Sequence, residues 1–530
     1  MEHLYSSKLS KEIYDVIIIG SGLGGLTTAS ILAKEGKKVL ILERHYEPGG
    51  FTHTFKRKKF EWDVGVHYIG QVADEKSTTR KAFDYITSNK LKWTSMGDVY
   101  DKIIIGNDHY DYLTGKENQI KNLIGHFPEE KEAIEKYFAL LEKNGVLNSM
   151  YFGFRSAPPF IGKILNFLFN KGFYKYSDKT TYEVLKDLTH NEKLICVLAG
   201  QCGNYGLMPK KSSFAIHATV ASHYIDGGSY PIGGAAAIHE NIIDEIEKSG
   251  GIIALKAEVN KILTDGKKAI GVEMKNGDKI YAKVIVSNAG AKNTFNKLLP
   301  DRNHLPVGMT RELDEVKPSV SHLALYIGLN KSDEELNLPK CNYWLYNSYN
   351  FDEDFNNFYD DNSSPLPLAY VSFPSAKDPE WPLKHKNMST IQVLMPCKFE
   401  WVSEWENETW MKRGDQYNEL KEKFKNILLE KLYEVVPQIK GHIEICEVST
   451  PLSTKHFSNY SSGEMYGLEH SPERFRMKYI RPHTPIKNLF LTGQDIVTVG
   501  VAGALFSGLL TSVAVMHKNL YSKVMSYKPE

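Results

Sequence analysis

The chain has 530 residues, of which 42% are hydrophobic and 24% charged, a globular composition that excludes disorder as its main state. Its formal net charge is +1, so no global field attracts nucleic acid and we expect no nucleic-acid partner. The length favours two domains over one.

The cysteines and the termini bear on location. Five cysteines without C-x-x-C or zinc-type spacing favour a reduced intracellular chain, and the sequence contains no metal-binding motif. The N-terminal stretch has no apolar run of signal-peptide length, so we expect a cytoplasmic protein. Residues 496–516 carry no charge and have the length of a spanning helix, but they are glycine-rich and follow a strand. A cofactor-binding helix explains them better.

The first 45 residues predict a strand, a helix and a second strand, at 14–19, 23–34 and 38–43. The glycines between the first strand and the helix fit G-x-G-x-x-G, where Gly20 permits the turn, Gly22 lets the backbone approach a pyrophosphate and Gly25 permits close packing. Glu43 ends the second strand, where its carboxylate can accept hydrogen bonds from a ribose. This unit predicts a dinucleotide site.

Two further segments select FAD as the dinucleotide. Gly49 and Gly50, shortly after Arg44, let the backbone run beside the ribityl–flavin part of a longer cofactor. Far along the chain, Asp495 ends a strand and can accept a hydrogen bond from a ribityl hydroxyl. The helix that follows begins near Val501 and Ala502, whose N–H groups can face the flavin C2 carbonyl. Arg44 and Val259 complete the predicted FAD contacts.

Glycine-punctuated apolar blocks alternate with segments richer in aromatic and charged residues. Around 230–290 the pattern predicts a helix at 235–248 and strands at 252–263, 269–275 and 279–286, the last two joined by an Asn-Gly turn. We therefore predict an α/β protein in which a discontinuous Rossmann-type FAD-binding domain (1–75, 215–300 and 485–530) is interleaved with an α+β substrate domain (76–214 and 301–484).

These motifs identify a family. The dinucleotide fingerprint, the Pro-Gly-Gly turn and the C-terminal glycine-rich segment resemble the phytoene desaturase-like, carotenoid oxidoreductase flavoproteins. The chain is most similar to their retinol saturase branch, in residues 60–70, 213–217, 223–224, 373–379 and 491–496. The resemblance covers nearly the whole chain. The sequence departs from the family in one respect. The animal members begin with an endoplasmic-reticulum signal, and we find no such signal in this sequence.

The resemblance implies an FAD-dependent oxidoreductase that acts on a conjugated isoprenoid, with a retinoid as the expected substrate and an unidentified electron donor. In the saturating direction a hydride from flavin N5 reaches one carbon of a double bond and a proton reaches the other. His67 and Tyr68 are the candidate proton donors, against the alternative of a structural histidine. A carotenoid desaturase, a carotenoid isomerase and a flavin-free isoprenoid escort protein stay open as alternatives.

Residues 159–176 form a strongly apolar helical pattern with a narrow polar stripe. Two interpretations compete for this segment. It is either a helix that dips into a membrane at the mouth of a substrate tunnel or a helix buried in the core. An insoluble isoprenoid enters from a bilayer or a carrier, which favours the first interpretation and predicts peripheral membrane contact.

Overall fold

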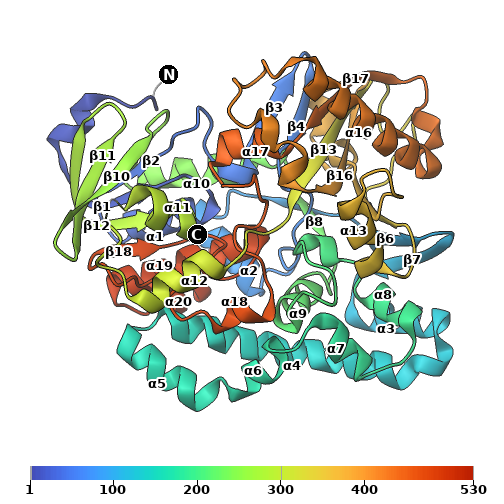
Figure 1. The fold of residues 1–530 in the computed structure, drawn as a ribbon, viewed down its shortest axis with the longest axis horizontal. Coiled ribbons are helices and arrows are strands. Elements are labelled where there is room, and N and C mark those ends of the chain that lie inside the picture. Colours follow the sequence, from blue (N-terminus) through green and yellow to red (C-terminus); the bar gives the residue numbers. More distant parts are fainter. Residues whose placement is uncertain (1–2, 300, 529–530) are drawn as a thin grey trace.

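The computed structural model describes residues 3–299 and 301–528, whose longer strands form two seven-stranded sheets. In Figure 1 the first sheet stands beside the two ends of the chain and the second lies across the molecule, with a layer of helices beneath both. The cofactor-binding residues predicted from the sequence all belong to the first sheet, the loops around it and two helices that pack on it.

The first sheet has a parallel centre because its strands are apolar on both faces and helices cover them. Its order is β18–β12–β1–β2–β9, and an antiparallel pair, β10 and β11, extends it past β12. The bounds are β1 Ile13–Ile19, β2 Val39–Leu42, β9 Ile252–Ala254, β10 Val259–Asp265, β11 Lys268–Met274, β12 Lys279–Ser287 and β18 Leu489–Leu491.

Helices from both ends of the chain pack on one face of this sheet. The N-terminal and C-terminal helices, α1 and α19, contact each other closely, and α10 packs on the other side of α1. The bounds of the helices on this face are α1 Leu23–Lys34, α2 Thr78–Thr87, α10 Ala236–Lys248, α19 Gly500–Met516 and α20 Leu520–Met525. The opposite face packs against α11 (Ala291–Asn293) and α12 (Val307–Glu315).

The second sheet is antiparallel except for one parallel pair, β14 with β6. Its order is β17 (Ile443–Ser449), β13 (Ser321–Leu329), β16 (Ser389–Cys397), β15 (Leu368–Ser372), β14 (Asn342–Tyr346), β6 (Val99–Ile105) and β7 (Asp108–Leu113). One face packs on α16 (Gly414–Val435) and α13 (Phe351–Asp360) through an apolar core. The other face turns toward the first sheet.

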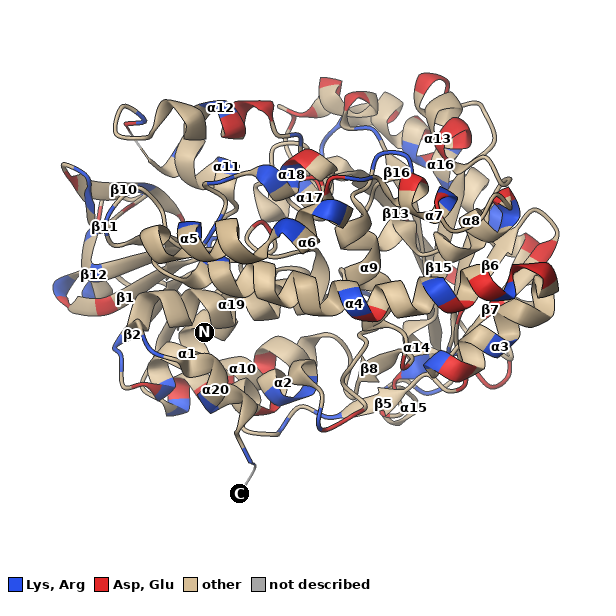
Figure 2. Ribbon diagram, turned by 90° about the horizontal axis from the view of Figure 1, so that it is seen from below, with Lys and Arg blue, Asp and Glu red and all other residues tan. Residues whose placement is uncertain are grey.

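A helical layer closes the lower side of the molecule as drawn in Figure 1, and Figure 2 shows this layer from below with acidic and basic residues interspersed. It comprises α3 Lys116–His126, α4 Lys131–Ser156, α5 Pro159–Phe169, α6 Lys171–Ser177, α7 Thr181–Lys186, α8 Glu192–Leu198 and α9 Phe214–His223. Shorter helices are α14 Pro374–Lys377, α15 Trp381–Lys384, α17 Pro451–Ser458 and α18 Pro472–Arg476.

Two short strand pairs lie between the sheets. β3 (Thr54–Arg57) forms a hairpin with β4 (Phe60–Asp63), and β5 (Trp93–Ser95) pairs with β8 (Ser229–Pro231). Every strand of the first sheet comes from the segments predicted for the cofactor domain. The β5–β8 pair, in contrast, joins a segment predicted for the substrate domain to one predicted for the cofactor domain.

The predicted elements are found with two differences. The strand predicted at 252–263 is two strands, β9 and β10, which lie at opposite edges of the sheet. The helix predicted at 159–176 breaks at Asn170 into α5 and α6. The apolar segment 496–516 forms α19, which packs against α1, and among the described residues no helix is long and apolar enough to cross a membrane.

Candidate active site

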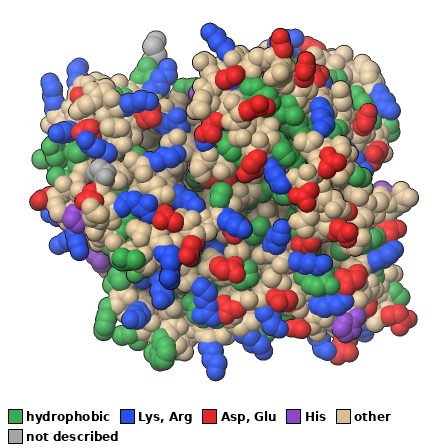
Figure 3. All heavy atoms as spheres, in the orientation of Figure 1, with side chains coloured by type: hydrophobic (Ala, Val, Ile, Leu, Met, Phe, Trp, Pro, Cys, Tyr) green, Lys and Arg blue, Asp and Glu red, His purple; other side chains and the backbone are tan. Residues whose placement is uncertain are grey.

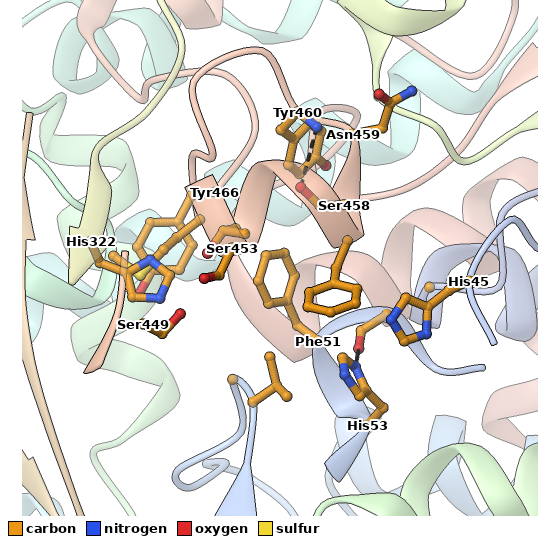
Figure 4. A pocket seen from close by; sticks show the side chains of 18 of the residues that line it. His45, Phe51, His53, His322, Ser449, Ser453, Ser458, Asn459, Tyr460 and Tyr466 are labelled. Carbon is orange, nitrogen blue, oxygen red and sulfur yellow. Dashed lines mark hydrogen bonds between the residues drawn. The ribbon is translucent and has the colours of Figure 1, made fainter. Parts of the chain in front are cut away.

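One cavity of about 650 Å³ extends between the two sheets and is lined by both ends of the chain. The loop after β1, the Gly49–Gly50 turn and the segment after β18 line one part, while the inner face of the second sheet lines the other. Figure 4 shows the region where these parts meet, with Phe51 between the His45 side and the His322 side. A cofactor bound at the first part therefore has a second, adjoining compartment for a substrate.

The two ends of the chain meet at glycines. A methyl group on Gly24 would lie 2.7 Å from the backbone nitrogen of Gly493, and one on Gly508 would lie 2.7 Å from the carbonyl oxygen of Gly24. Such contacts are shorter than van der Waals separations, so only glycine permits this approach. The predicted meeting of the N-terminal loop with the C-terminal segment is present in the structure.

Glu43 lies at the end of β2, as predicted, and its carboxylate organises the loop after β1. One oxygen accepts hydrogen bonds from the Ser21 N–H (2.8 Å) and hydroxyl (2.7 Å), and the other accepts from the His45 N–H (2.8 Å). A carboxylate has about four acceptor positions, so it retains capacity for a ribose hydroxyl. Beside it, the buried Nη1 of Arg44 has no hydrogen-bond partner among the described residues. An unpaired buried guanidinium nitrogen at this place fits an anionic dinucleotide.

Asp495 lines the cavity, and its side chain connects the segment after β18 to the Ala291 and Leu468 segments by hydrogen bonds. Its Oδ2 accepts from the Ala291 N–H (2.7 Å) and its Oδ1 from the Leu468 N–H (2.9 Å). Most of the other predicted FAD residues also line this cavity, namely Gly20, Gly22, Glu43, Arg44, Gly49, Gly50, Val259 and Val501. Gly25 and Ala502 are not among the lining residues; Gly25 instead packs against the carbonyl of Gly20.

Asn288, which was not predicted from the sequence, lines the cofactor part of the cavity. It follows β12, and its Nδ2 donates to the carbonyl of Gly22 (3.2 Å). Methyl groups on Gly22 or Gly493 would fall within 3 Å of its side chain. Its position directly after a buried parallel strand was the available signal, because ligands bind at the carboxyl ends of such strands.

His67 lies in the cavity wall, as expected of a residue that contacts substrate, and its ring lies 5.2 Å from that of Tyr370. Burial, the neighbouring Lys377 ammonium and His322 together lower the pKa of His67 to about 3. Lys377 is itself buried and donates to the His67 carbonyl (2.9 Å) and the Ser372 hydroxyl (2.7 Å). The imidazole is therefore neutral at physiological pH, and its pKa is not near neutrality as the prediction of a general acid assumed.

Tyr68 points away from the cavity and is not among its lining residues. Its hydroxyl donates to Asp101 (2.7 Å) and accepts from Asn204 (3.0 Å). Burial and the Asp101 carboxylate raise the pKa of Tyr68 well above its usual range. The role in proton transfer predicted for His67 and Tyr68 stays a prediction. Because Tyr68 does not line the cavity, it can pass a proton to a substrate only by way of neighbouring polar groups.

The second sheet supplies an aromatic wall that the sequence analysis did not identify. Strand register places Trp344 opposite Tyr370 and Tyr370 opposite Leu394, so the three side chains share one face. All three line the cavity, together with Phe355, Leu368, Met208 and Tyr466. This compartment suits an elongated apolar molecule.

Comparison with known proteins gives the family. A family model described as flavin containing amine oxidoreductase matches residues 23–392. The chain belongs to this family. It is similar to the all-trans-retinol 13,14-reductase of Danio rerio, with 36% identity over 97% of this chain and 88% of the relative. A second Danio rerio relative, named inactive all-trans-retinol 13,14-reductase, is 34% identical over 98% of this chain and 88% of its own length.

A more distant relative and a solved structure extend the comparison. Prolycopene isomerase 2 of an Oncidium hybrid cultivar is 25% identical over 94% of this chain and 83% of its own length. The crystal structure of an oxidoreductase from Methanosarcina mazei has the same fold, with a TM-score of 0.64, 16% identity, and coverage of 95% of this chain and 100% of that one. As a member of the flavin-containing family with an intact dinucleotide site, the chain is an FAD-dependent oxidoreductase of α/β fold. Within the described residues, no group of His, Cys, Asp and Glu side chains is placed to hold a metal.

Proposed function

We propose that the chain reduces a carbon–carbon double bond of all-trans-retinol or of a closely related conjugated isoprenoid. The observation that carries this proposal is the continuous cavity, in which the cofactor part opens directly into an aromatic compartment on the second sheet. The similarity to reductases of all-trans-retinol supports the same substrate class. Because a relative of similar identity is named inactive, the activity requires a direct test.

The residues of this chain bind FAD and position the substrate. When bound and reduced, FAD supplies a hydride to one carbon of the double bond. The loop after β1 and the N-terminus of α1 hold the diphosphate, Glu43 the ribose, and Asp495 and the start of α19 the ribityl–flavin end. Trp344, Tyr370 and their neighbours align the polyene and exclude water. His67 is the candidate for delivering the second hydrogen as a proton, from a neutral imidazole.

Turnover of retinol tests the proposal. The purified flavoprotein, reduced anaerobically, is expected to convert all-trans-retinol into a product heavier by two hydrogens, with a shortened conjugated system and a blue-shifted absorbance. The flavin should reoxidise in step with product, and mass spectrometry and absorbance follow both. The oxidised protein is the matched control and should form no product.

Other outcomes of this experiment separate the rival activities. Retinol that changes geometry without changing mass would favour an isomerase, as in the prolycopene isomerase relative. Unreacted retinol, combined with flavin reduction by a carotenoid, would favour a desaturase. Either result overturns the proposed reduction of retinol.

We also propose that α5 contacts the surface of a lipid bilayer. Only Gly162 is buried in this helix, which does not fit the alternative of a core helix. Phe160 and Phe167 are 76% and 85% exposed, and Ile161, Ile164, Leu168 and Phe169 are also exposed. Apolar side chains gather at the lower left of Figure 3, where Figure 1 places α5. None of the described residues of α5 lines the cavity, so the predicted position at a tunnel mouth is not found.

Replacing Phe160 and Phe167 together by serine is expected to lower binding to phosphatidylcholine vesicles at least about tenfold, because two phenyl groups no longer enter the bilayer. Sedimentation with vesicles measures this effect. Since both side chains are exposed, thermal stability should not change. The matched control replaces Val307 and Leu383, which are 84% and 77% exposed elsewhere, by serine and should bind like the wild type. Equal binding by both variants would contradict the proposal.

A further inference from the structure

A small cluster of uncharged polar side chains lies in the part of the cavity that the second sheet lines. It consists of His322 on β13, Ser449 at the end of β17 and Ser453 on α17, and all three residues line the cavity. In Figure 4 their side chains point toward one another. The pairing of β13 with β17 places Ala324 opposite Ser449, so His322 and Ser449 lie on the same face of adjacent strands.

His322 is the least accessible member of the cluster and lacks a partner. Its side chain is 5% exposed, and Nδ1 has no hydrogen-bond partner among the described residues. Burial lowers the pKa of His322 to about 4, so the ring is neutral at physiological pH. A buried polar atom without a partner costs free energy, which a ligand able to pair with the ring recovers on binding.

The cluster adjoins the cofactor part of the cavity. The Met465 N–H donates to the carbonyl of Val320 (3.1 Å), two residues before His322. Three residues further along, the Leu468 N–H donates to Asp495 (2.9 Å). The segment 465–468 thus joins the strand that carries His322 to the residue predicted to hold the ribityl chain. Figure 4 shows the cluster in the same region of the cavity as Phe51, which directly follows the Gly49–Gly50 turn.

We infer that His322, Ser449 and Ser453 bind the terminal hydroxyl of the polyene and thereby select which double bond is reduced. The inference rests on the proposed function. A neutral imidazole and two hydroxyls offer donors and acceptors without charge, which suits an alcohol. In all-trans-retinol the hydroxyl-bearing carbon is bonded to C14. Anchoring the hydroxyl beside the cofactor therefore presents the terminal double bond and keeps the interior ones away.

Binding to the oxidised flavoprotein tests this inference without turnover. The ligands are all-trans-retinol and the hydrocarbon in which hydrogen replaces its hydroxyl, and flavin absorbance reports binding. The wild type is expected to bind retinol about tenfold more tightly, which is the net contribution of about one hydrogen bond between neutral groups. In His322→Leu and in the double variant Ser449→Ala, Ser453→Ala, the preference should fall to about twofold or less. His322→Gln should restore part of it, because the amide can donate and accept.

The matched control is Ser458→Ala. Ser458 lies on the same helix as Ser453 and lines the same cavity, but Figure 4 places it near Tyr460, away from His322. The Ser458→Ala variant should have the same ratio of retinol affinity to hydrocarbon affinity as the wild type. Under turnover, the wild type should give one dihydro product, and the cluster variants should give a mixture of double-bond positions.

The outcomes separate this inference from the proposed function. If the wild type binds retinol more tightly than the hydrocarbon but does not reduce it, the hydroxyl site is supported and the proposed function is contradicted. A wild type that reduces retinol yet binds the hydrocarbon equally well would overturn the hydroxyl site alone. Cluster variants that retain the wild-type ratio and a single product would also overturn it.

Discussion

Replacing Asp495 by alanine is expected to release FAD and to lower the free energy of unfolding by about 3 kcal/mol. The carboxylate is 3% exposed and accepts the N–H groups of Ala291 and Leu468, so its removal leaves two buried donors unpaired, at about 1–3 kcal/mol each. The same change removes the acceptor predicted for a ribityl hydroxyl. The ratio of flavin to protein absorbance after gel filtration, and urea unfolding with FAD in fixed excess, measure the two effects.

Asp495→Asn is the matched control, because it keeps the size and one acceptor oxygen but turns the second position into a donor. It should lose less FAD and less stability than the alanine variant. An alanine variant that keeps full flavin occupancy would contradict the cofactor role. If the alanine variant instead loses flavin while its free energy of unfolding is unchanged, Asp495 stabilises the bound cofactor, and its hydrogen bonds to Ala291 and Leu468 contribute little to folding.

The cofactor part of the cavity was predictable because its motifs consist of residues that are close together in the sequence. A glycine pattern between a strand and a helix, and a carboxylate at the end of the next strand, led to Gly22 and Glu43, which both line the cavity. Asp495 was found by the same reasoning at the other end of the chain. Gly25 was assigned a packing role and fulfils it without lining the cavity.

The substrate part was not predictable, since it depends on pairing between distant strands. Trp344 and Tyr370 share the face toward the cavity because β14 and β15 pair in a register that aligns them, and a shift of either strand by one residue would turn its side chain away. The environment of His67 likewise depends on Lys377, 310 residues later in the chain. Spacing in the sequence therefore could not reveal that the imidazole is neutral.

Buried histidines make the fold sensitive to acid, and His217 gives the cleanest test. Its ring is 3% exposed and lies between the hydroxyls of Tyr137 (2.9 Å) and Tyr205 (3.1 Å). Burial lowers its pKa from 6.5 to about 3. Between these values the unfolded chain binds a proton that the folded chain does not, so stability rises with pH and falls on acidification. Buried Asp63 and Asp101, whose pKa values burial raises to about 6, act in the opposite direction below pH 6.

The comparison of wild type with His217→Gln isolates this histidine, because the aspartates are common to both. Lowering the pH from about 7.5 to about 5 is expected to cost the wild type about 2 kcal/mol more free energy of unfolding than the variant. Glutamine keeps a donor and an acceptor for the two tyrosines, so the variant should fold. Urea unfolding followed by tryptophan fluorescence at both pH values measures the difference. Parallel pH dependences in the two proteins would show that His217 gains its proton in the folded state as readily as in the unfolded chain.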